Sequence, residues 1–265
     1  MRISKTGVKN WCIGKLLPPP CVAEEQQYSM LYSEHDAPGT PTDTLIALGL
    51  EICQRAAELK RRGFAGKMKT APPRFHWWPG EHYYFLAALA DVLKPRLFVE
   101  IGTHRGYSAL SILETLPSDC ELVTYDIIPW REFDAPALAE SDFRPGRFSQ
   151  RIGDLLEGNH WQANREVFER AEVVFIDGPK DGRWEGRLIE LLEKTDWFRP
   201  RLVVFDDVRL WRMLKTWRKM ARPKLDLASL GHFTGTGLVE WTSPRTRTVL
   251  EGDRVPQQAR PSERQ

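Results

Sequence analysis

The stretch from Leu97 to Leu116 constrains the fold more than any other part of the sequence. An apolar run from Leu97 to Ile101 is followed by Gly102 and Gly106, and apolar residues at helical spacing continue to Leu116. This pattern predicts a buried strand, a tight turn and an amphipathic helix. Such a unit is typical of a parallel sheet whose ligand binds at the carboxyl ends of the strands.

The spacing of the two glycines indicates which kind of ligand the turn suits. Glycines let the backbone come close to a ligand, beside the free N–H groups of a helix N-terminus. Gly102 and Gly106 form a Gly-x-x-x-Gly turn, which differs from the Gly-x-Gly-x-x-Gly turn that binds a dinucleotide phosphate. Glu100, just before the turn, would repel a pyrophosphate and could pair with a ligand cation. The turn therefore favours a nucleoside with a positive centre over NAD.

Further apolar runs predict that strands and helices alternate along the chain. Arg147–Ile152 is less apolar than the other predicted strands, so we expect it at an edge of the sheet. Leu225–Leu230 and Thr236–Trp241 are joined by so short a turn that they must be antiparallel. We therefore predict an α/β fold, in which a mostly parallel sheet ends in one antiparallel strand pair and is flanked by helices. The other strands are predicted at Leu97–Ile101, Glu121–Asp126, Glu172–Asp177 and Arg201–Asp206.

Helices and irregular segments complete the predicted organisation. Thr42 or Asp43 can cap a helix that Gly63 ends. Prolines before Thr40 indicate an irregular arm that packs on the domain or on a partner subunit, and the polar residues from Gly252 onward indicate disorder. Residues 63–79 are predicted to be a linker rich in basic and aromatic residues. The helices are predicted at Asp43–Arg62, Glu81–Leu93, Tyr107–Leu116, Trp184–Lys194 and Val208–Met220.

The motif from Glu100 to Ser108, Glu-Ile-Gly-Thr-His-Arg-Gly-Tyr-Ser, resembles the first motif of class I S-adenosylmethionine-dependent methyltransferases. It is most similar to the cation-dependent O-methyltransferases related to catechol O-methyltransferase, or methyltransferase family 24. The resemblance implies a Rossmann-like methyltransferase sheet and S-adenosylmethionine as cofactor. It divides the chain into an N-terminal arm and helical extension (1–79), a cofactor-binding domain (80–250) and a tail (251–265). The residues it assigns to the methionine end of the cofactor are Glu100, Gly102, Thr103, Gly106, Tyr107 and Ser108.

Carboxylates stand at the ends of four of the five predicted parallel strands, and they should converge on one crevice. Asp126 lies about 24 residues beyond Gly102, where a carboxylate can accept both hydroxyls of a ribose. By resemblance, Gly153 and Asp154 frame the adenine, with Asp154 near its exocyclic amine. Asp177 faces the same crevice and is a further candidate for cofactor binding.

Two further segments resemble the metal-binding segments of catechol-type enzymes. In the first, Asp177 ends a strand and Lys180 follows three residues later. In the second, Asp206 and Asp207 are adjacent at the end of the next strand. Three carboxylates offer the hard oxygen ligands that Mg²⁺ or a similar divalent cation prefers. The resemblance makes Lys180 the general base that deprotonates the acceptor, for which its pKa would have to be lowered from about 10.4. The alternative is a metal-free site, in which the aspartates cap loops and Lys180 pairs with Asp181.

Other groups could also touch a substrate. His104 lies in the motif loop and is a second catalytic candidate, ranked above His232 in the turn between the last strands. The aromatic run Phe75–Tyr84 forms either a lid or pocket wall, or only the ordinary packing of a helix on the sheet. The basic helix Val208–Met220 is interpreted as a solvated face of a core-packed helix rather than a nucleic-acid patch.

Together these features indicate an enzyme that moves a methyl group from S-adenosylmethionine to a hydroxyl of a small molecule. After the fourth strand the chain reads Asp-Gly-Pro-Lys, without the Asn/Asp-Pro-Pro-aromatic run of amino-directed methyltransferases. The acceptor could be a phenol, a catechol or a sugar, and the sequence does not choose among them. An RNA methyltransferase and a non-catalytic S-adenosylmethionine-binding protein remain the alternatives.

Composition and charge indicate the cellular location and the partners that we expect for this protein. The formal net charge of +2 gives no sign of a nucleic-acid partner. No apolar run is long enough to cross a membrane, and the N-terminus shows no signal-peptide pattern. The four cysteines have neither metal spacing nor a pairing pattern. We therefore expect a cytoplasmic protein, with a homodimer left open.

Overall fold

The computed structural model describes residues 39–70, 82–195, 201–228, 230–231 and 234–241. The predicted N-terminal arm, the greater part of the linker with Phe75–Gly80, His232 and the predicted tail all lie outside the described residues. Among the described helices, none is long and apolar enough to span a bilayer.

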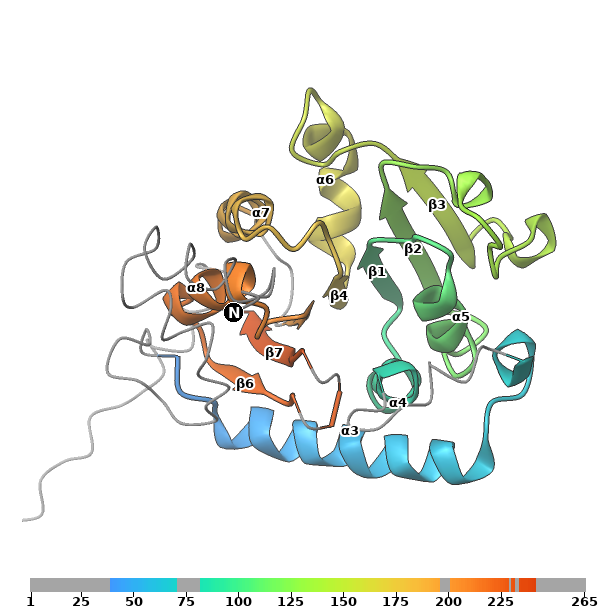
Figure 1. The fold of residues 1–265 in the computed structure, drawn as a ribbon, viewed down its shortest axis with the longest axis horizontal. Helices are drawn as coiled ribbons and strands as arrows, with labels where there is room; N and C mark the ends of the chain where they lie inside the picture. The colour runs from blue at the N-terminus through green and yellow to red at the C-terminus, as the bar shows by residue number, and fades with distance from the viewer. Residues whose placement is uncertain (1–38, 71–81, 196–200, 229, 232–233, 242–265) are drawn as a thin grey trace, which may run out of the picture.

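A seven-stranded sheet with the order β3-β2-β1-β4-β5-β7-β6 forms the centre of the molecule (Figure 1). The first five strands are parallel, and β7 is antiparallel to both of its neighbours. This confirms the predicted Rossmann-like sheet, including β3 at its edge. The strands are β1 Leu97–Ile101, β2 Glu121–Asp126, β3 Phe148–Ile152, β4 Val173–Ile176, β5 Arg201–Asp206, β6 Lys224–Asp226 and β7 Thr236–Trp241.

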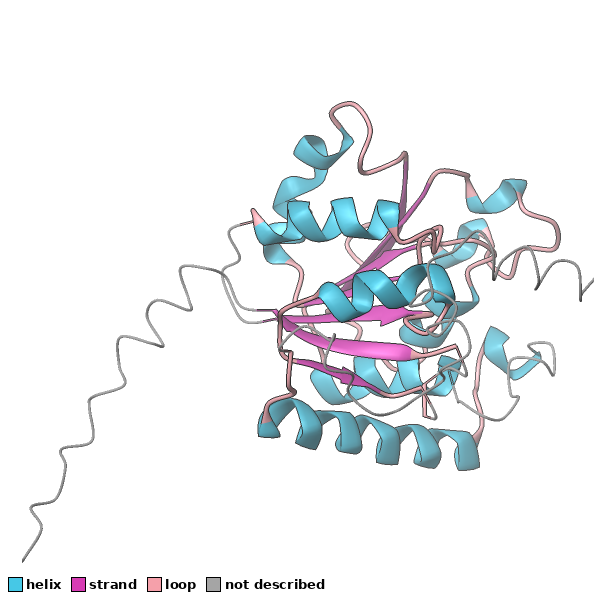
Figure 2. Ribbon diagram, turned by 60° about the vertical axis from the view of Figure 1, so that its left-hand side comes forward, coloured by secondary structure: helices cyan, strands magenta, loops and turns pink. Residues whose placement is uncertain are grey.

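Helices cover both faces of this sheet, as Figure 2 shows. Alternation along each strand sends one set of side chains, such as Phe98, into the core beneath α3, α4 and α5. The intervening set, such as Val99, packs with residues of α6, α7 and α8. The helices are α3 Asp43–Arg62, α4 His82–Leu93, α5 Tyr107–Leu113, α6 His160–Arg170, α7 Arg183–Glu193 and α8 Trp211–Lys219.

The longest helix, α3, has the ends that its capping residues predict. The Thr42 hydroxyl accepts a hydrogen bond from the Leu45 N–H at 3.1 Å. Gly63 ends the helix with a φ of 77° and donates its N–H to Leu59. The buried face of α3 packs along α4, beneath the sheet (Figure 1). The predicted helical extension is therefore part of the core of this fold.

Some predicted boundaries were wrong, and turns explain two of them. Helix α8 begins at Trp211 rather than Val208, because Asp207 has a φ of 58° and its carbonyl accepts the Leu210 N–H in a turn. Strand β6 ends at Asp226, whose carboxylate accepts the N–H of Ala228. Helix α5 ends at Leu113 instead of Leu116, and helix α6 was not located from the sequence.

Candidate active site

A pocket of about 530 Å³ opens at the carboxyl ends of β1, β2 and β4. The strand order reverses between β1 and β4, and this switch point is where open α/β sheets bind their ligands. The pocket therefore lies where the sequence placed the crevice. The predicted site residues that line it are Gly102, His104, Asp126, Gly153, Asp154, Asp177 and Lys180.

The turn after β1 requires glycine at two positions. Gly102 has a φ of 106°, and a Cβ there would collide with the carbonyl of Asp177 at the end of β4. Gly106 has a φ of 85°, and a Cβ there would overlap the side chain of Leu138. Glycine at position 102 thus lets the ends of β1 and β4 meet at the pocket floor.

Asp126 ties this turn to the loop after β2. One of its carboxylate oxygens accepts the backbone N–H of His104 at 2.7 Å, and the other accepts that of Ile128 at 3.1 Å. An ionised carboxylate offers about four acceptor positions, so Asp126 keeps capacity for two ligand hydroxyls. His104 itself is exposed on the pocket rim, with its ring 4.6 Å from that of Phe133.

The opposite end of the pocket holds Gly153 and Asp154. One carboxylate oxygen of Asp154 accepts the indole N–H of Trp184 and the backbone N–H of Leu156, both at 2.9 Å. Trp184 lines the pocket and was missed by the sequence analysis, although an aromatic residue so close after the Asp-Gly-Pro-Lys turn was an available signal. The indole fixes the direction in which Asp154 presents its carboxylate.

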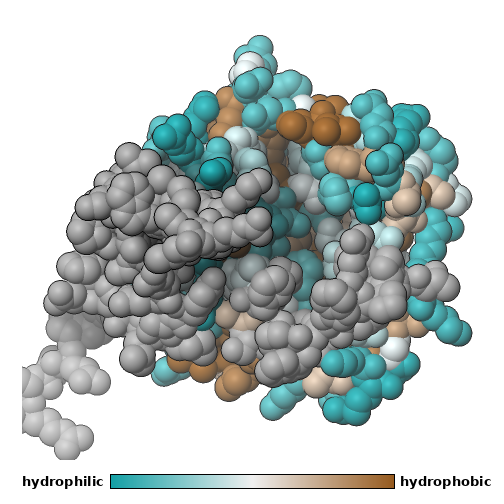
Figure 3. Space-filling view, in the orientation of Figure 1, coloured by the Kyte–Doolittle hydropathy of each residue, from teal (hydrophilic) through white to brown (hydrophobic). Residues whose placement is uncertain are grey.

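An apolar rim borders this end and was also missed. Ile127 and Ile128, directly after Asp126, are 65% and 37% exposed, and both line the pocket. In Figure 3, hydrophobic side chains gather at the top of the molecule, over the ends of β2 and β3. Two adjacent isoleucines in an exposed loop suit the flat apolar face of a ligand ring.

Several residues of the first motif lie behind the pocket rather than in its lining. Glu100 is fully buried and accepts a hydrogen bond from the Thr124 hydroxyl at 2.6 Å. That hydroxyl is also 2.8 Å from the hydroxyl of Thr103. Burial raises the pKa of Glu100 to about 8, against hydrogen bonds from Ser108 and Thr124 that lower it. Contact of these residues, and of Tyr107, with a cofactor stays a prediction.

The acidic cluster forms as predicted at the ends of β4 and β5. Asp177, Asp206 and Asp207 each present an oxygen, and these oxygens lie within 4.8 Å of one another. Asp206 and Asp207 are buried, each 4% exposed, and Asp177 is half-buried. The two strands are neighbours in the sheet, so residues far apart in the sequence meet here.

Lys180 lies among these three carboxylates. Its Nζ is 2.7 Å from Asp177 and 3.3 Å from Asp206, and it also pairs with Asp207. The alternative in which Lys180 pairs with Asp181 is wrong, since Asp181 instead accepts the backbone N–H groups that begin α7. Lys180 has a φ of 60°, a conformation that positions its side chain over the cluster.

The cluster changes the proton affinities of its members. Burial alone would lower the pKa of Lys180, but the charges of Asp177, Asp206 and Asp207 raise it overall. The lowered pKa that a base role requires is therefore absent from this arrangement. Burial, and then the charge of Asp206, raise the pKa of Asp177 to about 6. Three carboxylates around one ammonium leave excess negative charge, and their hard oxygens fit a divalent cation.

Two further groups adjoin the cluster and were not among the site residues named from the sequence. His82, in the first turn of α4, has its Nδ1 3.7 Å from an oxygen of Asp206. Tyr83 is half-buried beside it, and burial followed by the charges of Asp177 and Asp206 raises its pKa. These two residues belong to the aromatic run, whose described part thus forms a wall next to the cluster. The chemical signal was a histidine and a tyrosine at the start of the helix preceding the motif.

Glu185 holds the turn that carries Lys180. Its side chain is fully buried, and its two oxygens accept the backbone N–H groups of Lys180 at 2.7 Å and Gly182 at 2.9 Å. A carboxylate that accepts two N–H groups at a helix N-terminus is well stabilised. The position of Lys180 therefore depends on a residue five positions further along the chain, in the first turn of α7.

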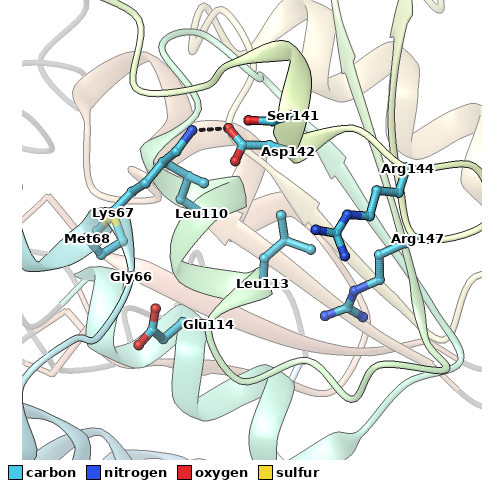
Figure 4. A pocket seen from close by; sticks show the side chains of 10 residues that line it. All are labelled: Gly66, Lys67, Met68, Leu110, Leu113, Glu114, Ser141, Asp142, Arg144 and Arg147. Atoms are coloured by element: carbon cyan, nitrogen blue, oxygen red, sulfur yellow. Dashed lines mark hydrogen bonds and ion pairs between the residues drawn. The ribbon is translucent and has the colours of Figure 1, made fainter.

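A separate pocket of about 300 Å³ lies near the end of α5, and none of the predicted site residues lines it. Figure 4 shows an ion pair between Lys67 and Asp142, 2.5 Å long, at one side of this pocket. On the other side the guanidinium groups of Arg144 and Arg147 point toward Leu113. Its lining holds the acids Glu114 and Asp142, but among the described residues the clustered acids are those at the ends of β4 and β5.

Residues 99–208 match a family model described as a methyltransferase domain. This part of the chain is thus similar to methyltransferase domains. It contains the whole acidic cluster and every predicted site residue from Glu100 to Asp207.

Relatives of the methyltransferase domain include a caffeoyl-CoA O-methyltransferase from Pinus taeda, which is 29% identical over 119 residues. The match covers 41% of this chain and 43% of that protein, so it spans less than half of the relative's length. A Podospora anserina methyltransferase solved with S-adenosylhomocysteine is 16% identical, with a TM-score of 0.46 over 82% of this chain and 100% of that one. The O-methyltransferase TomG from Streptomyces achromogenes, solved with S-adenosylmethionine, is 19% identical, with a TM-score of 0.46 over 74% and 90% of the two chains.

We predict that Gly102→Ala destabilises the methyltransferase domain. The φ of 106° and the clash with the Asp177 carbonyl should lower the free energy of unfolding by about 1–3 kcal/mol or more, measured by urea denaturation. Gly186→Ala in α7 is the matched control, because a Cβ there meets open space. That control should be stabilised by about 0.5–1 kcal/mol. Equal stability of the two variants would contradict the steric account.

Glu100→Gln should change how stability depends on pH. The folded-state pKa of about 8 exceeds the ordinary value of 4.5, so stability is lost as pH rises between these values. The cofactor-free variant has no carboxylate at position 100 that can ionise. Its free energy of unfolding should equal that of the parent at pH about 5 and be higher by about 2–5 kcal/mol at pH about 9. Urea unfolding across this range measures the difference. A difference that does not vary with pH would show that Glu100 is ionised without penalty.

Proposed function

We propose that the protein transfers a methyl group from S-adenosylmethionine to a hydroxyl oxygen of a small molecule, assisted by a divalent cation. One observation carries the proposal: Asp177 and Lys180 line the strand-end pocket and also belong to the acidic cluster. A cofactor in the pocket and an acceptor at the cluster would therefore meet at these residues. The Pinus taeda relative, an O-methyltransferase by name, supports oxygen as the methyl acceptor.

The cofactor would occupy the pocket with its nucleoside between Asp126 and Asp154. Asp126 would accept the ribose hydroxyls, and the apolar rim at Ile127 and Ile128 would cover the adenine. The methionine end would then point toward Gly102 and Asp177, at the switch point. This places the sulfonium beside a carboxylate-rich wall, which favours a positively charged cofactor over the neutral product.

The acceptor hydroxyl would bind at the cluster. Asp177, Asp206 and Asp207 would hold the cation, which when bound lowers the pKa of the acceptor hydroxyl and orients it toward the methyl group. Lys180, protonated in the described arrangement, would donate a hydrogen bond to the acceptor oxygen. It would take up the hydroxyl proton only where its ion pairs are weakened. His104, on the ribose side of the pocket, is the second candidate for the base.

The two alternative functions, a non-catalytic binding protein and an RNA methyltransferase, have less structural support. A non-catalytic binding protein would have no use for an intact cluster of Asp177, Lys180, Asp206 and Asp207. An RNA methyltransferase would need a continuous basic surface, whereas Arg209 and Arg222 beside α8 are paired with Asp226 and Glu193. The proposal includes a cytoplasmic location, which the free thiols of Cys53 and Cys120 support.

Asp126→Ala should weaken binding of S-adenosylhomocysteine. Loss of charge-assisted hydrogen bonds to the ribose should cost about 1.5–3 kcal/mol, or roughly 10- to 150-fold in Kd by calorimetry. Asp134→Ala removes an exposed acid that does not line the pocket and should leave Kd unchanged. Because Asp126 also anchors two backbone N–H groups, Asp126→Asn should bind with intermediate affinity. Unchanged affinity in both variants would remove Asp126 from the cofactor site.

A methyl-transfer screen tests the function itself. Labelled S-adenosylmethionine is offered with catechols, phenols and sugar hydroxyls, with added Mg²⁺ or after treatment with a chelator. We expect transfer to at least one oxygen acceptor, lost on chelation and restored by the cation. Transfer that survives chelation would refute the metal assignment, and tight NADH binding without transfer would refute the function.

Variants of the cluster refine this test. Asp206→Asn and Asp207→Asn should lower kcat and leave the Kd for S-adenosylhomocysteine nearly unchanged, since neither residue lines the cofactor pocket. Lys180→Met should lower kcat by about 10²–10⁴-fold if Lys180 transfers the proton. A kcat within about threefold of the parent would move the base role to His104.

A further inference from the structure

A basic pocket of about 560 Å³ lies between the first turns of α7 and α8. It adjoins the candidate active site along the chain, because Asp181 and Gly182, which line it, directly follow Lys180. The Thr216 hydroxyl of α8 donates to the Gly182 carbonyl at 2.8 Å, which joins the two helices at the pocket floor. The turn that presents Lys180 to the cluster therefore also forms one side of this second pocket.

The charge of the pocket is strongly positive. Arg183, Arg212 and Lys215 line it, and within the described part of the chain none of the three has a carboxylate at ion-pair distance. The one acid in the lining, Asp181, accepts the backbone N–H groups of Arg183 and Trp184 with one carboxylate oxygen. The charges of Arg183 and Arg212 also act on Asp181, but three cations against one carboxylate leave a net positive potential that attracts anions.

Neighbouring basic residues differ in this respect. Arg209, before α8, is 2.8 Å from Asp226, and Arg222, after it, is paired with Glu193. The charges of Arg209 and Arg222 are thus matched by acids, whereas those of Arg183, Arg212 and Lys215 gather at one pocket. A concave cluster of three cations suits the anionic group of a small molecule, whereas a nucleic-acid backbone needs a longer row of cations.

An aromatic side chain completes the pocket. Trp211 is 45% exposed, and the guanidinium of Arg212 lies 5.0 Å from its ring centroid. Stacking on the indole restricts the orientations of the Arg212 guanidinium, which reduces the entropy lost when it binds an anion. Arg212 and Lys215 are one helical turn apart, so both can reach a single group.

We infer that this pocket binds a phosphate group of the methyl acceptor, so that the acceptor is a hydroxyl-bearing small molecule that carries a phosphate. The inference rests on the proposed function, since it assigns the substrate class of the same reaction. The hydroxyl would lie at Asp206 and Asp207, and the phosphate would lie beyond the Lys180–Gly182 turn, at Arg212 and Lys215.

The pocket is tested first by direct binding, without any turnover. Pyrophosphate is titrated by calorimetry at constant ionic strength and without divalent metal, into the parent and into the double variant Arg212→Ala/Lys215→Ala. We expect the double variant to bind at least about tenfold more weakly. Lys219→Ala removes an exposed lysine of the same helix that does not line the pocket, and it should bind like the parent. Equal binding by all three proteins overturns the site.

The substrate class is tested with matched acceptors. A dihydroxyphenyl compound is offered with and without a phosphate ester on its side chain. The double variant should raise KM for the phosphorylated acceptor at least about tenfold, with kcat and the KM of the neutral acceptor unchanged. An equal effect on both acceptors overturns the phosphate assignment, as does tighter, steeply salt-dependent binding of RNA. If no acceptor is methylated, the proposed function fails, while the pyrophosphate titration still decides whether the pocket binds anions.

Discussion

Three carboxylates held around one ammonium group at the ends of β4 and β5 are the interaction on which the rest of the site depends. Asp206 and Asp207 are buried, so their charges are tolerated only with a cation close by. Lys180 supplies one positive charge, and the surplus acidity makes the place suitable for a second cation. The residues that would hold a metal are thus also held together by their ion pairs with Lys180.

This network also explains why the first turns of two helices approach the cluster. Helix α7 begins where Asp181 and Glu185 accept the backbone N–H groups of the turn, which leaves the Lys180 side chain available to Asp177. Helix α4 brings His82 to Asp206 from the other face of the sheet. The cluster thus has contacts with both layers of helices. A change in either layer would alter the positions of its side chains.

The strands and the acids at their ends could be predicted from the sequence, because both depend on local patterns of residues. Apolar runs marked β1, β2 and β5 nearly to the residue, and parallel strands necessarily bring Asp126 and Asp177 to one edge. Contacts between distant segments could not be predicted. The pairing of Lys180 with three carboxylates depends on its φ of 60°, and Glu100 is buried because helices cover both faces of β1, whose five residues are all buried. The role of Trp184 in orienting Asp154 needs two loops to meet, for which no single stretch contains a signal.

Five non-glycine residues in the described structure have a positive φ, and three of them, His104, Lys180 and Asp207, belong to the candidate site. This left-handed conformation costs a residue with a side chain free energy that glycine would not lose. At these positions the chain keeps a chemically active side chain in a backbone conformation that is unfavourable for any residue other than glycine. Selection for higher stability and selection for higher activity would thus favour different residues at the same few positions. A history of substitution at positions 104, 180 and 207 would record which of the two pressures prevailed.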